Sequence, residues 1–219
     1  MNKKILEEKF IEYRKYLVSE AIYMASYISL YKCLQERRND RLDQMNIAPG
    51  FFQTVLRALF SVIIIWVDKF FDEKSERGIF DLLNFVEKNV SIFSISNLKE
   101  RENYPNDHWM LNRKPITIEL INEDRQRIRE LKSLKSFKIR RNKYHAHFDK
   151  EYFFDRGKID QDAPLNWNDF EEVIEITKDI LSRYSSSFDG TVNAIVPINS
   201  TDINRILNIL YDRDNQEYG

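Results

Sequence analysis

Residues 140–149 bring together side chains that can handle a phosphodiester; they read Arg-Arg-Asn-Lys-Tyr-His-Ala-His-Phe-Asp. A guanidinium grips phosphate oxygens through two parallel hydrogen bonds, and a histidine exchanges protons near neutral pH. The pair needs no metal ion and no cofactor to act on a phosphodiester. The stretch therefore predicts a site built from an arginine and a histidine.

Helical geometry decides which of these side chains share a face, because each residue turns the helix by about 100°. Arg141 and His145 are four residues apart and share one face, whereas Arg140 and His147, seven apart, share another. Arg141 and His147 diverge by about 120° on a straight helix. Arg141 also falls within the apolar stripe of this helix, which consists of Leu134, Phe137, Tyr144 and Phe148. An arginine at such a position is destabilising unless it is paired or faces a cleft. A site explains this position better than solvation does.

The positive charge of the chain is concentrated in residues 125–150. This segment carries a local charge of +8, residues 151–219 carry −8, and the whole chain carries −1. Such an asymmetry favours either the binding of a polyanion or the pairing of a solvated helix face with the acidic segment. The cations expected to contact phosphates are Arg140, Lys138, Lys143 and Lys135, with Arg125, Arg127 and Lys132 as further members of the basic segment.

Apolar residues recur every three or four positions through most of the chain, which predicts helices and no βαβ pattern. The expected helices are 7–38, 51–71, Ser75 as N-cap to about residue 89, 118–148 after Thr117 as N-cap, a helix opened by Asn168 and Glu171 that runs to about residue 184, and 201–211. Residues 91–115 and 152–164 read as connections. The sequence predicts an all-α fold with about five main helices.

Residues 60–67 are apolar on every side, which predicts a helix surrounded by other helices. The apolar run 58–67 is bounded by Arg57 and Asp68 and falls short of the ~20 residues that span a bilayer, so no membrane association is expected. With 219 residues, the chain fits a single domain, 1–219, with its own core. A lone cysteine, Cys33, and an acidic start favour the reducing cytoplasm.

Arg141-Asn142 followed by His147 resembles the signature of the HEPN superfamily, in which an Arg and a His are separated by four to six residues, the first usually polar. The resemblance extends beyond this motif. Phe51-Phe52 before a long apolar helix that ends at Asp68, together with residues 141–149, resembles the abortive-infection U2-type HEPN group over most of the chain.

This resemblance implies a compact helical bundle and a metal-independent ribonuclease of antiviral, abortive-infection or toxin-antitoxin systems, with RNA as substrate and an antitoxin or another defence protein as partner. Arg141 would bind the scissile phosphate, His147 would act as general acid or base at the ribose 2′-hydroxyl, and Asn142 would orient one of them. The 2′-hydroxyl attack would leave a 2′,3′-cyclic phosphate, a route open only to RNA. HEPN ribonucleases usually join two motifs across a dimer, so a homodimer is expected, and it would resolve the 120° divergence.

Several alternatives stay open. His145 is a second candidate for the catalytic histidine, because it pairs with Arg140 or Arg141 by spacing. His145, His147 and Asp149 could be read as metal ligands, although no fourth ligand is evident. Asp149 stands where some HEPN toxins carry a tyrosine that a partner nucleotidyltransferase modifies, which puts that control in doubt. The competing functions are a non-catalytic RNA-binding or interaction module and a helical adaptor that uses its acidic last 69 residues.

Overall fold

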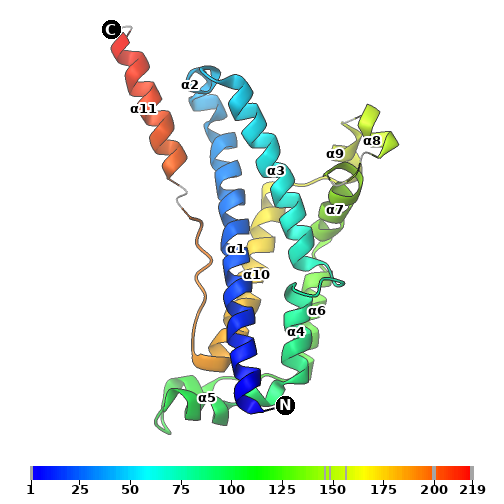
Figure 1. The fold of residues 1–219 in the computed structure, drawn as a ribbon, viewed down its shortest axis with the longest axis vertical. Coiled ribbons are helices and arrows are strands. Elements are labelled where there is room, and N and C mark those ends of the chain that lie inside the picture. The colour runs from blue at the N-terminus through cyan, green and yellow to red at the C-terminus, as the bar shows by residue number, and fades with distance from the viewer. Residues whose placement is uncertain (1, 146, 148, 156, 199–200, 218–219) are drawn as a thin grey trace.

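The computed structural model describes residues 2–145, 147, 149–155, 157–198 and 201–217, with side chains up to residue 213. Within these residues every regular element is helical and none is a strand (Figure 1). The long helix α1 (Lys3–Asp40) packs against both α3 (Pro49–Phe71) and α10 (Trp167–Asp189), and the short α2 (Leu42–Asn46) reverses the chain between α1 and α3. The all-α prediction is confirmed.

The remaining elements surround this central group. They are α4 (Ile79–Lys88), η1 (Val90–Phe93), α5 (Ile95–Glu102), η2 (Trp109–Asn112), α6 (Ile118–Arg129), α7 (Lys132–Arg140), the π-helix η3 (Arg141–His145), α8 (Lys150–Phe154), α9 (Lys158–Asp162) and α11 (Asp202–Glu217). The helix α11 follows an extended segment and lies against α1 and α2.

The described residues hold eleven α-helices rather than about five, because the short helices α2, α5, α8 and α9 were not predicted and the predicted helix 118–148 is divided. The first part, α6, packs on α4, whereas α7 packs along α3. Leu131 has extended backbone angles and breaks the helix between them. The predicted connection 91–115 also contains helical turns, η1, α5 and η2.

Local hydrogen bonds decide where the helices begin. Thr117 caps α6 as predicted, because its side chain accepts from the backbone N–H of Leu120. Ser75 does not cap α4, which begins after Gly78. The capping box of α10 is formed by Asn166 and Asp169, two residues earlier than predicted. The helix ends, later than predicted, at Asp189.

Gly190 ends α10 in a left-handed conformation with φ of 76°. A Cβ atom there would lie 2.9 Å from the hydroxyl of Tyr104 and 3.0 Å from Cε of Met110. The left-handed backbone angle therefore favours glycine at this position, and a Cβ atom would also displace the ends of these two side chains.

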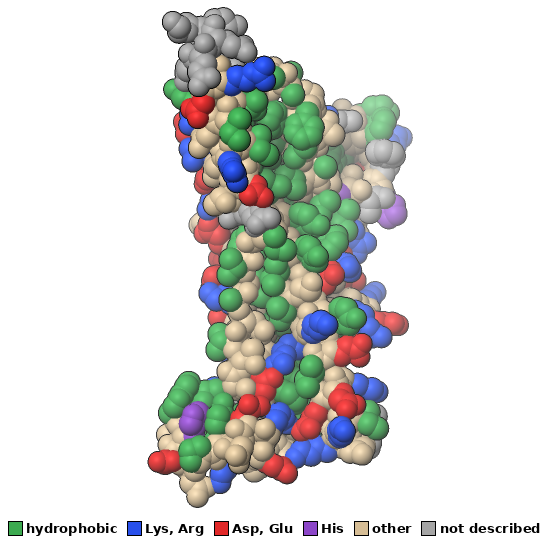
Figure 2. All heavy atoms as spheres, turned by 60° about the vertical axis from the view of Figure 1, so that its left-hand side comes forward, with side chains coloured by type: hydrophobic (Ala, Val, Ile, Leu, Met, Phe, Trp, Pro, Cys, Tyr) green, Lys and Arg blue, Asp and Glu red, His purple; other side chains and the backbone are tan. Residues whose placement is uncertain are grey.

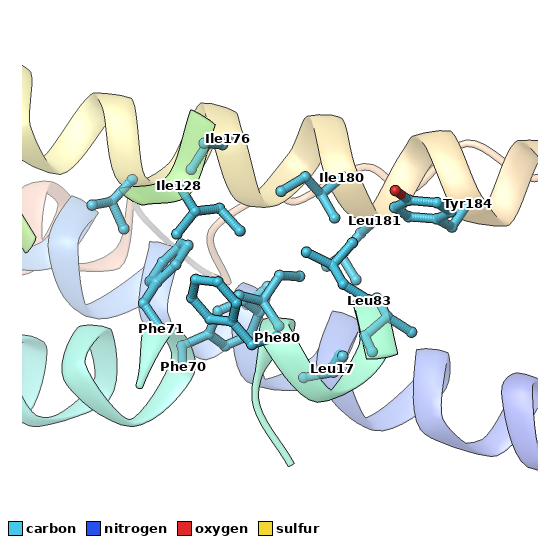
Figure 3. Close-up of a cluster of buried hydrophobic side chains, with 14 of the residues drawn as sticks. Leu17, Phe70, Phe71, Phe80, Leu83, Ile128, Ile176, Ile180, Leu181 and Tyr184 are labelled. Atoms are coloured by element: carbon cyan, nitrogen blue, oxygen red, sulfur yellow. The ribbon is translucent and has the colours of Figure 1, made fainter. Parts of the chain in front are cut away.

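The main core lies where five helices converge. Figure 3 shows side chains from α1, α3, α4, α6 and α10 pointing toward one another, among them Leu17, Phe70, Phe80, Ile128 and Tyr184. A second, smaller cluster joins α11 to α1, α2 and α3 through Leu34, Met45, Phe52, Leu59 and Leu207. Burial of these apolar side chains is the main favourable contribution to folding.

The helix α3 is not surrounded on every side, contrary to the prediction from its sequence. Its face with Phe52, Ile63 and Val67 is buried, but Phe51 is 63% and Ile65 40% exposed. It is also the one described helix that is long and apolar enough to cross a membrane, and 22% of its most apolar window is buried. Figure 2 shows hydrophobic side chains gathered along the upper half of one face of the molecule. A large apolar surface therefore stays uncovered in the single chain.

Candidate functional site

Arg141 is bound by a carboxylate of the most apolar helix. Its Nε donates to Oδ2 of Asp68 at 2.7 Å, and its Nη2 lies 2.6 Å from the same oxygen. The side chain of Asp68 is 7% exposed and that of Arg141 30%. Arg141, which was predicted to lie on the apolar stripe of its helix, thus has the carboxylate partner that such a position requires. A guanidinium has five N–H donors, and the donors of Arg141 that Asp68 does not use bind no described residue, so they stay available to a phosphate.

His145 is held by a second polar residue of α3. Its Nδ1 lies 2.9 Å from Oγ of Ser61, and its ring packs edge-on against Phe60. Ser61 and Asp68 are seven residues apart and therefore share one face of α3, so η3 is fixed at both of its ends. Two polar contacts on one helix face set the position of the motif.

The environment of His145 keeps its imidazole neutral. Burial, together with the charge of Arg140, lowers the pKa of His145 to about 4. Its Nε2 is buried and has no hydrogen-bond partner among the described residues. At neutral pH this ring cannot readily take up a proton.

His147 lies beyond the end of η3, in a bend, and is exposed. The prediction of one helix to residue 148 is therefore wrong at residues 141–145 and 147, where a π-helix and a bend replace α-helix; residues 146 and 148 lie outside the described ones. The 120° separation from Arg141 assumed a straight α-helix and does not apply here. A π-turn often occurs at a functional position, because its extra residue re-aims the side chains that follow.

The two histidines open onto one pocket of about 180 Å³. It is lined by Ser61, Lys143, Tyr144, His145, His147, Asp149, Tyr152 and Phe153. Arg141 is not among its described lining residues. The structure therefore brings the histidines together and leaves Arg141 at a separate place on the surface of the single chain.

Asn142 and Lys143 differ in what they contact. Asn142 is half-buried, and its amide makes no hydrogen bond to a described residue. Lys143 Nζ lies 2.7 Å from Oδ2 of Asp149, and this contact raises the pKa of Lys143. Lys143 thus lines the pocket with its charge already paired.

Arg140 is buried, and the expectation that it contacts phosphates does not fit its position. It is 4% exposed, its Nε donates to the carbonyl of Ala163 at 2.6 Å, and its Nη2 lies 2.8 Å from Asp160. These contacts attach α9 to the end of α7. Arg140 therefore stabilises the fold around the site.

The other arginines of the basic segment are also paired with carboxylates. Arg125 pairs with Glu87, Arg127 with Asp124 and Asp179, and Arg129 with Glu73. Asp160 and Asp179 belong to the acidic segment 151–219, so part of the segment's charge is neutralised there, as one reading of the sequence expected. Of the lysines named with them, Lys143 is paired with Asp149, so Lys132, Lys135 and Lys138 are the ones without an ion pair to a described residue.

Lys132, Lys135 and Lys138 line a groove of about 880 Å³. Its floor is apolar, with Phe71, Leu134 and Phe137 among the lining side chains, and Asp68 also borders it. The pKa of Glu73 is lowered mainly by its hydrogen bond from Arg129, and the charge of Lys138 lowers it further. Four carboxylates, those of Asp68, Asp72, Glu73 and Glu130, also line the groove. The groove thus combines these carboxylates with the three lysines, and Asp68 connects it to Arg141.

Metal ligands are not clustered within the described part of the chain. No group of three or more His, Cys, Asp or Glu side chains there is arranged to hold an ion. Asp149, considered as a ligand beside the histidines, instead pairs with Lys143 and caps α8 through the N–H of Glu151.

Sequence reasoning missed the partners of the motif, Ser61 and Asp68. Their signal was present: a hydroxyl and a carboxylate seven residues apart interrupt the most apolar stretch of the chain. Polar groups that share one face of such a helix must meet polar partners.

Of three comparisons with known proteins, one identifies a family for this chain. No curated protein and no solved structure matches the chain. A family model described as AbiU2, within the HEPN proteins, matches residues 7–207. The match runs from α1 into α11 and includes Asp68, Arg141 and His147. The chain therefore belongs to the AbiU2 family, the abortive-infection U2-type group of the HEPN superfamily.

Proposed function

We propose that this protein is a cytoplasmic, metal-independent endoribonuclease of prokaryotic defence that acts as a homodimer. The observation that carries the proposal is the pairing of Arg141 with the buried Asp68, which leaves a fixed guanidinium at the surface; His147, six positions later in the sequence, is exposed, and both lie within the matched family region. A phosphate-binding cation and a proton carrier are the two parts that RNA cleavage by the 2′-hydroxyl requires.

In the reaction, Arg141 binds a non-bridging oxygen of the scissile phosphate and stabilises the charge that develops there. His147 accepts the proton of the ribose 2′-hydroxyl while that oxygen attacks phosphorus. The bond from phosphorus to the 5′-oxygen breaks, and that oxygen receives a proton from the protonated second copy of His147 in the dimer. The products are a 2′,3′-cyclic phosphate and a 5′-hydroxyl.

Base and acid act on opposite sides of phosphorus in an in-line displacement, so one histidine does not serve both steps easily. A homodimer supplies two copies of His147 and two of Arg141 in one cleft. This arrangement also accounts for the separation of Arg141 from the histidine pocket within one chain.

We assign His145 a positioning role and His147 the proton transfer. His145 is held neutral by burial and is bound to Ser61, whereas His147 is exposed. Asn142, whose amide binds no described residue, is free to orient Arg141 or the phosphate.

The second copy would bind an apolar stripe of α3. Phe51, Val55, Ala58, Val62 and Ile65 follow one another at intervals of four and three residues, and each is exposed or half-buried. Such spacing forms a continuous seam along a helix. Ile65 lies within about one turn of both Ser61 and Asp68 on α3, so a chain docked on this stripe would sit beside η3.

Single-stranded RNA would enter along the lysine groove. Lys132, Lys135 and Lys138 offer point charges to phosphates, and Asp68, the partner of Arg141, also lines this groove. The substrate backbone would thus reach the guanidinium directly.

The test compares wild type with His147→Ala, His145→Gln and Arg141→Lys, each incubated with mixed single-stranded RNA in EDTA, with product ends read by mass spectrometry. Cyclic-phosphate ends are expected from wild type, at a reduced rate from His145→Gln, and from neither of the other two. Equal cleavage by wild type and His147→Ala would contradict the assignment. RNA binding without cleavage by wild type would instead favour a non-catalytic binding module.

A further inference from the structure

A third pocket lies between residues 113–116, α6 and α10. Its volume is about 620 Å³, and it is lined by four cations, Arg113, Lys114, Arg127 and Arg183, by two acids, Glu123 and Asp179, and by two serines. It shares no described lining residue with the histidine pocket or the lysine groove. Its lining therefore carries an excess of positive charge outside the proposed ribonuclease site.

Arg113 forms no ion pair with any residue that the structure describes. Its Nε and Nη1 are buried and have no hydrogen-bond partner among the described residues, and its Nη2 contacts only the sulfur of Met110, at 3.4 Å. A thioether is a weak acceptor. Burial accordingly lowers the pKa of the Arg113 guanidinium. A buried charge of this kind is destabilising unless an anion and hydrogen bonds compensate it.

A buried carboxylate fixes two further guanidinium groups at this pocket. Asp124 is fully buried and accepts from Nη1 of Arg183 at 2.8 Å, from Nη1 of Arg127 at 3.3 Å and from the hydroxyl of Tyr184 at 2.8 Å. Nη2 of Arg127 also donates to Asp179 at 3.0 Å. These bonds use only some of the five N–H donors that each guanidinium offers. The arginines are thus held in place with donors to spare.

We propose that this pocket binds the phosphate group of a phosphorylated ligand up to the size of a nucleotide. Several arginines in fixed positions match the many acceptor oxygens of a phosphate better than the two of a carboxylate. The volume falls within the range of about 300–1,000 Å³ that small-molecule sites occupy. Lys114, which is exposed and forms no ion pair with a described residue, adds a point charge at the rim.

Calorimetric titration with sodium tripolyphosphate at constant ionic strength tests the site. The protein carries His147→Ala throughout, so that RNA cleavage cannot interfere and the result does not depend on the proposed ribonuclease activity. Arg113→Met keeps the apolar part of the side chain and removes the guanidinium, and Lys114→Ala removes the rim charge. Arg205→Met on α11, an exposed arginine far from this pocket in sequence, is the matched control.

Saturable binding is expected in the parent and in Arg205→Met. We expect Kd to rise on the order of tenfold in Arg113→Met and several-fold in Lys114→Ala, because each change removes one charged contact. Equal heats in all four proteins, or no binding at all, would overturn the proposal. Loss of binding in Arg205→Met as well would also overturn the proposal, because the heats would then reflect attraction to the cations of the protein in general and not this pocket.

Thermal unfolding separates a ligand site from a structural arginine. In buffer without multivalent anions, Arg113→Met should be as stable as the parent or more stable, because an uncompensated buried charge is removed. With tripolyphosphate, the parent should gain stability and the variant should not. A variant that is destabilised in plain buffer and gains as much as the parent from the anion would contradict the proposal.

Two sources could supply the phosphate, a free nucleotide or an RNA strand. Competition against tripolyphosphate distinguishes them: displacement by a mixture of mononucleotides assigns a soluble nucleotide, whereas displacement only by a single-stranded RNA oligomer assigns an RNA phosphate. Displacement by neither, with tripolyphosphate bound, would overturn the assignment to a phosphorylated ligand of this size.

Discussion

Asp68 and Arg141 lie 73 positions apart in the sequence and join α3 to the start of η3, with 2.6 Å between Oδ2 and Nη2. The carboxylate is buried and the guanidinium reaches the surface. The contact therefore does two things: it compensates a charge inside the most apolar helix and it fixes the one arginine of the motif that faces outward.

Replacing Asp68 with Asn removes the charge and keeps the shape. Because the carboxylate is buried but Arg141 is partly exposed, we expect the free energy of unfolding to fall by about 1–2 kcal/mol. RNA cleavage should fall more steeply, because Arg141 is no longer held. Urea unfolding followed by circular dichroism and the cleavage assay measure the two effects.

The matched control is Glu73→Gln in the exposed Arg129–Glu73 pair, where both side chains are about half exposed. An exposed pair contributes about 0–1 kcal/mol, so this variant should behave almost like wild type. Equal losses in the two variants would show that the Asp68 pair has no special role.

The sequence predicted the helical class, the position of most long helices and the stretch that holds the site. Periodicity suffices for these features because each helix buries one apolar face. The break at Leu131 and the π-helix at 141–145 were not predictable in this way. Both arise where one stretch of chain must fit two neighbours, which is a property of the packed structure.

The site shows the same division between local and tertiary information. Residue types and spacing identified Arg141 and the two histidines, whereas burial separated the roles of otherwise similar side chains. Arg140 and Arg141 are adjacent, yet the side chain of Arg140 is 5% exposed and pairs with Asp160, whereas that of Arg141 is 30% exposed and pairs with Asp68. Which arginine is available depends on α9 and α3, and neither is local to the motif.

Titration of His145 should make the protein less stable as the pH is lowered. The folded chain holds its pKa at about 4, below the ordinary value of 6.5, so the unfolded chain takes up the proton first as the pH falls. Stability is therefore complete above about pH 6.5 and declines between there and about pH 4. Since the ring is only partly buried, we expect a loss of about 1–2 kcal/mol over this window.

The measurement is urea unfolding of wild type and His145→Gln at pH 7.5 and pH 4.5. Glutamine keeps a hydrogen bond to Ser61 within reach but does not titrate, and the carboxyl groups of the two proteins cancel in the comparison. The variant should lose about 1–2 kcal/mol less than wild type on acidification. Identical losses would show that His145 is accessible to protons in the folded chain.

Lys135 and Lys138 should contribute to RNA affinity in a salt-dependent way. Replacing both with Ala removes two phosphate contacts, so the slope of log K against log salt for single-stranded RNA should decrease by about 1.4. Fluorescence anisotropy with a labelled oligomer in the His147→Ala background measures this slope. Lys15→Ala, an exposed lysine on α1, is the control and should leave the slope unchanged.

Introducing a charge on the stripe of α3 should separate the homodimer. Ala58 is exposed in the single chain, so Ala58→Asp leaves the fold intact but places an unpaired carboxylate in the centre of the proposed interface. We expect light scattering to give the dimer mass for wild type and the monomer mass for the variant, with loss of RNA cleavage. Ile118→Asp adds the same charge at an exposed apolar position on α6 and should remain dimeric and active.

A monomeric wild type that cleaves RNA would contradict the composite site. A monomer that floats with lipid vesicles would instead assign the apolar face of α3 to a membrane.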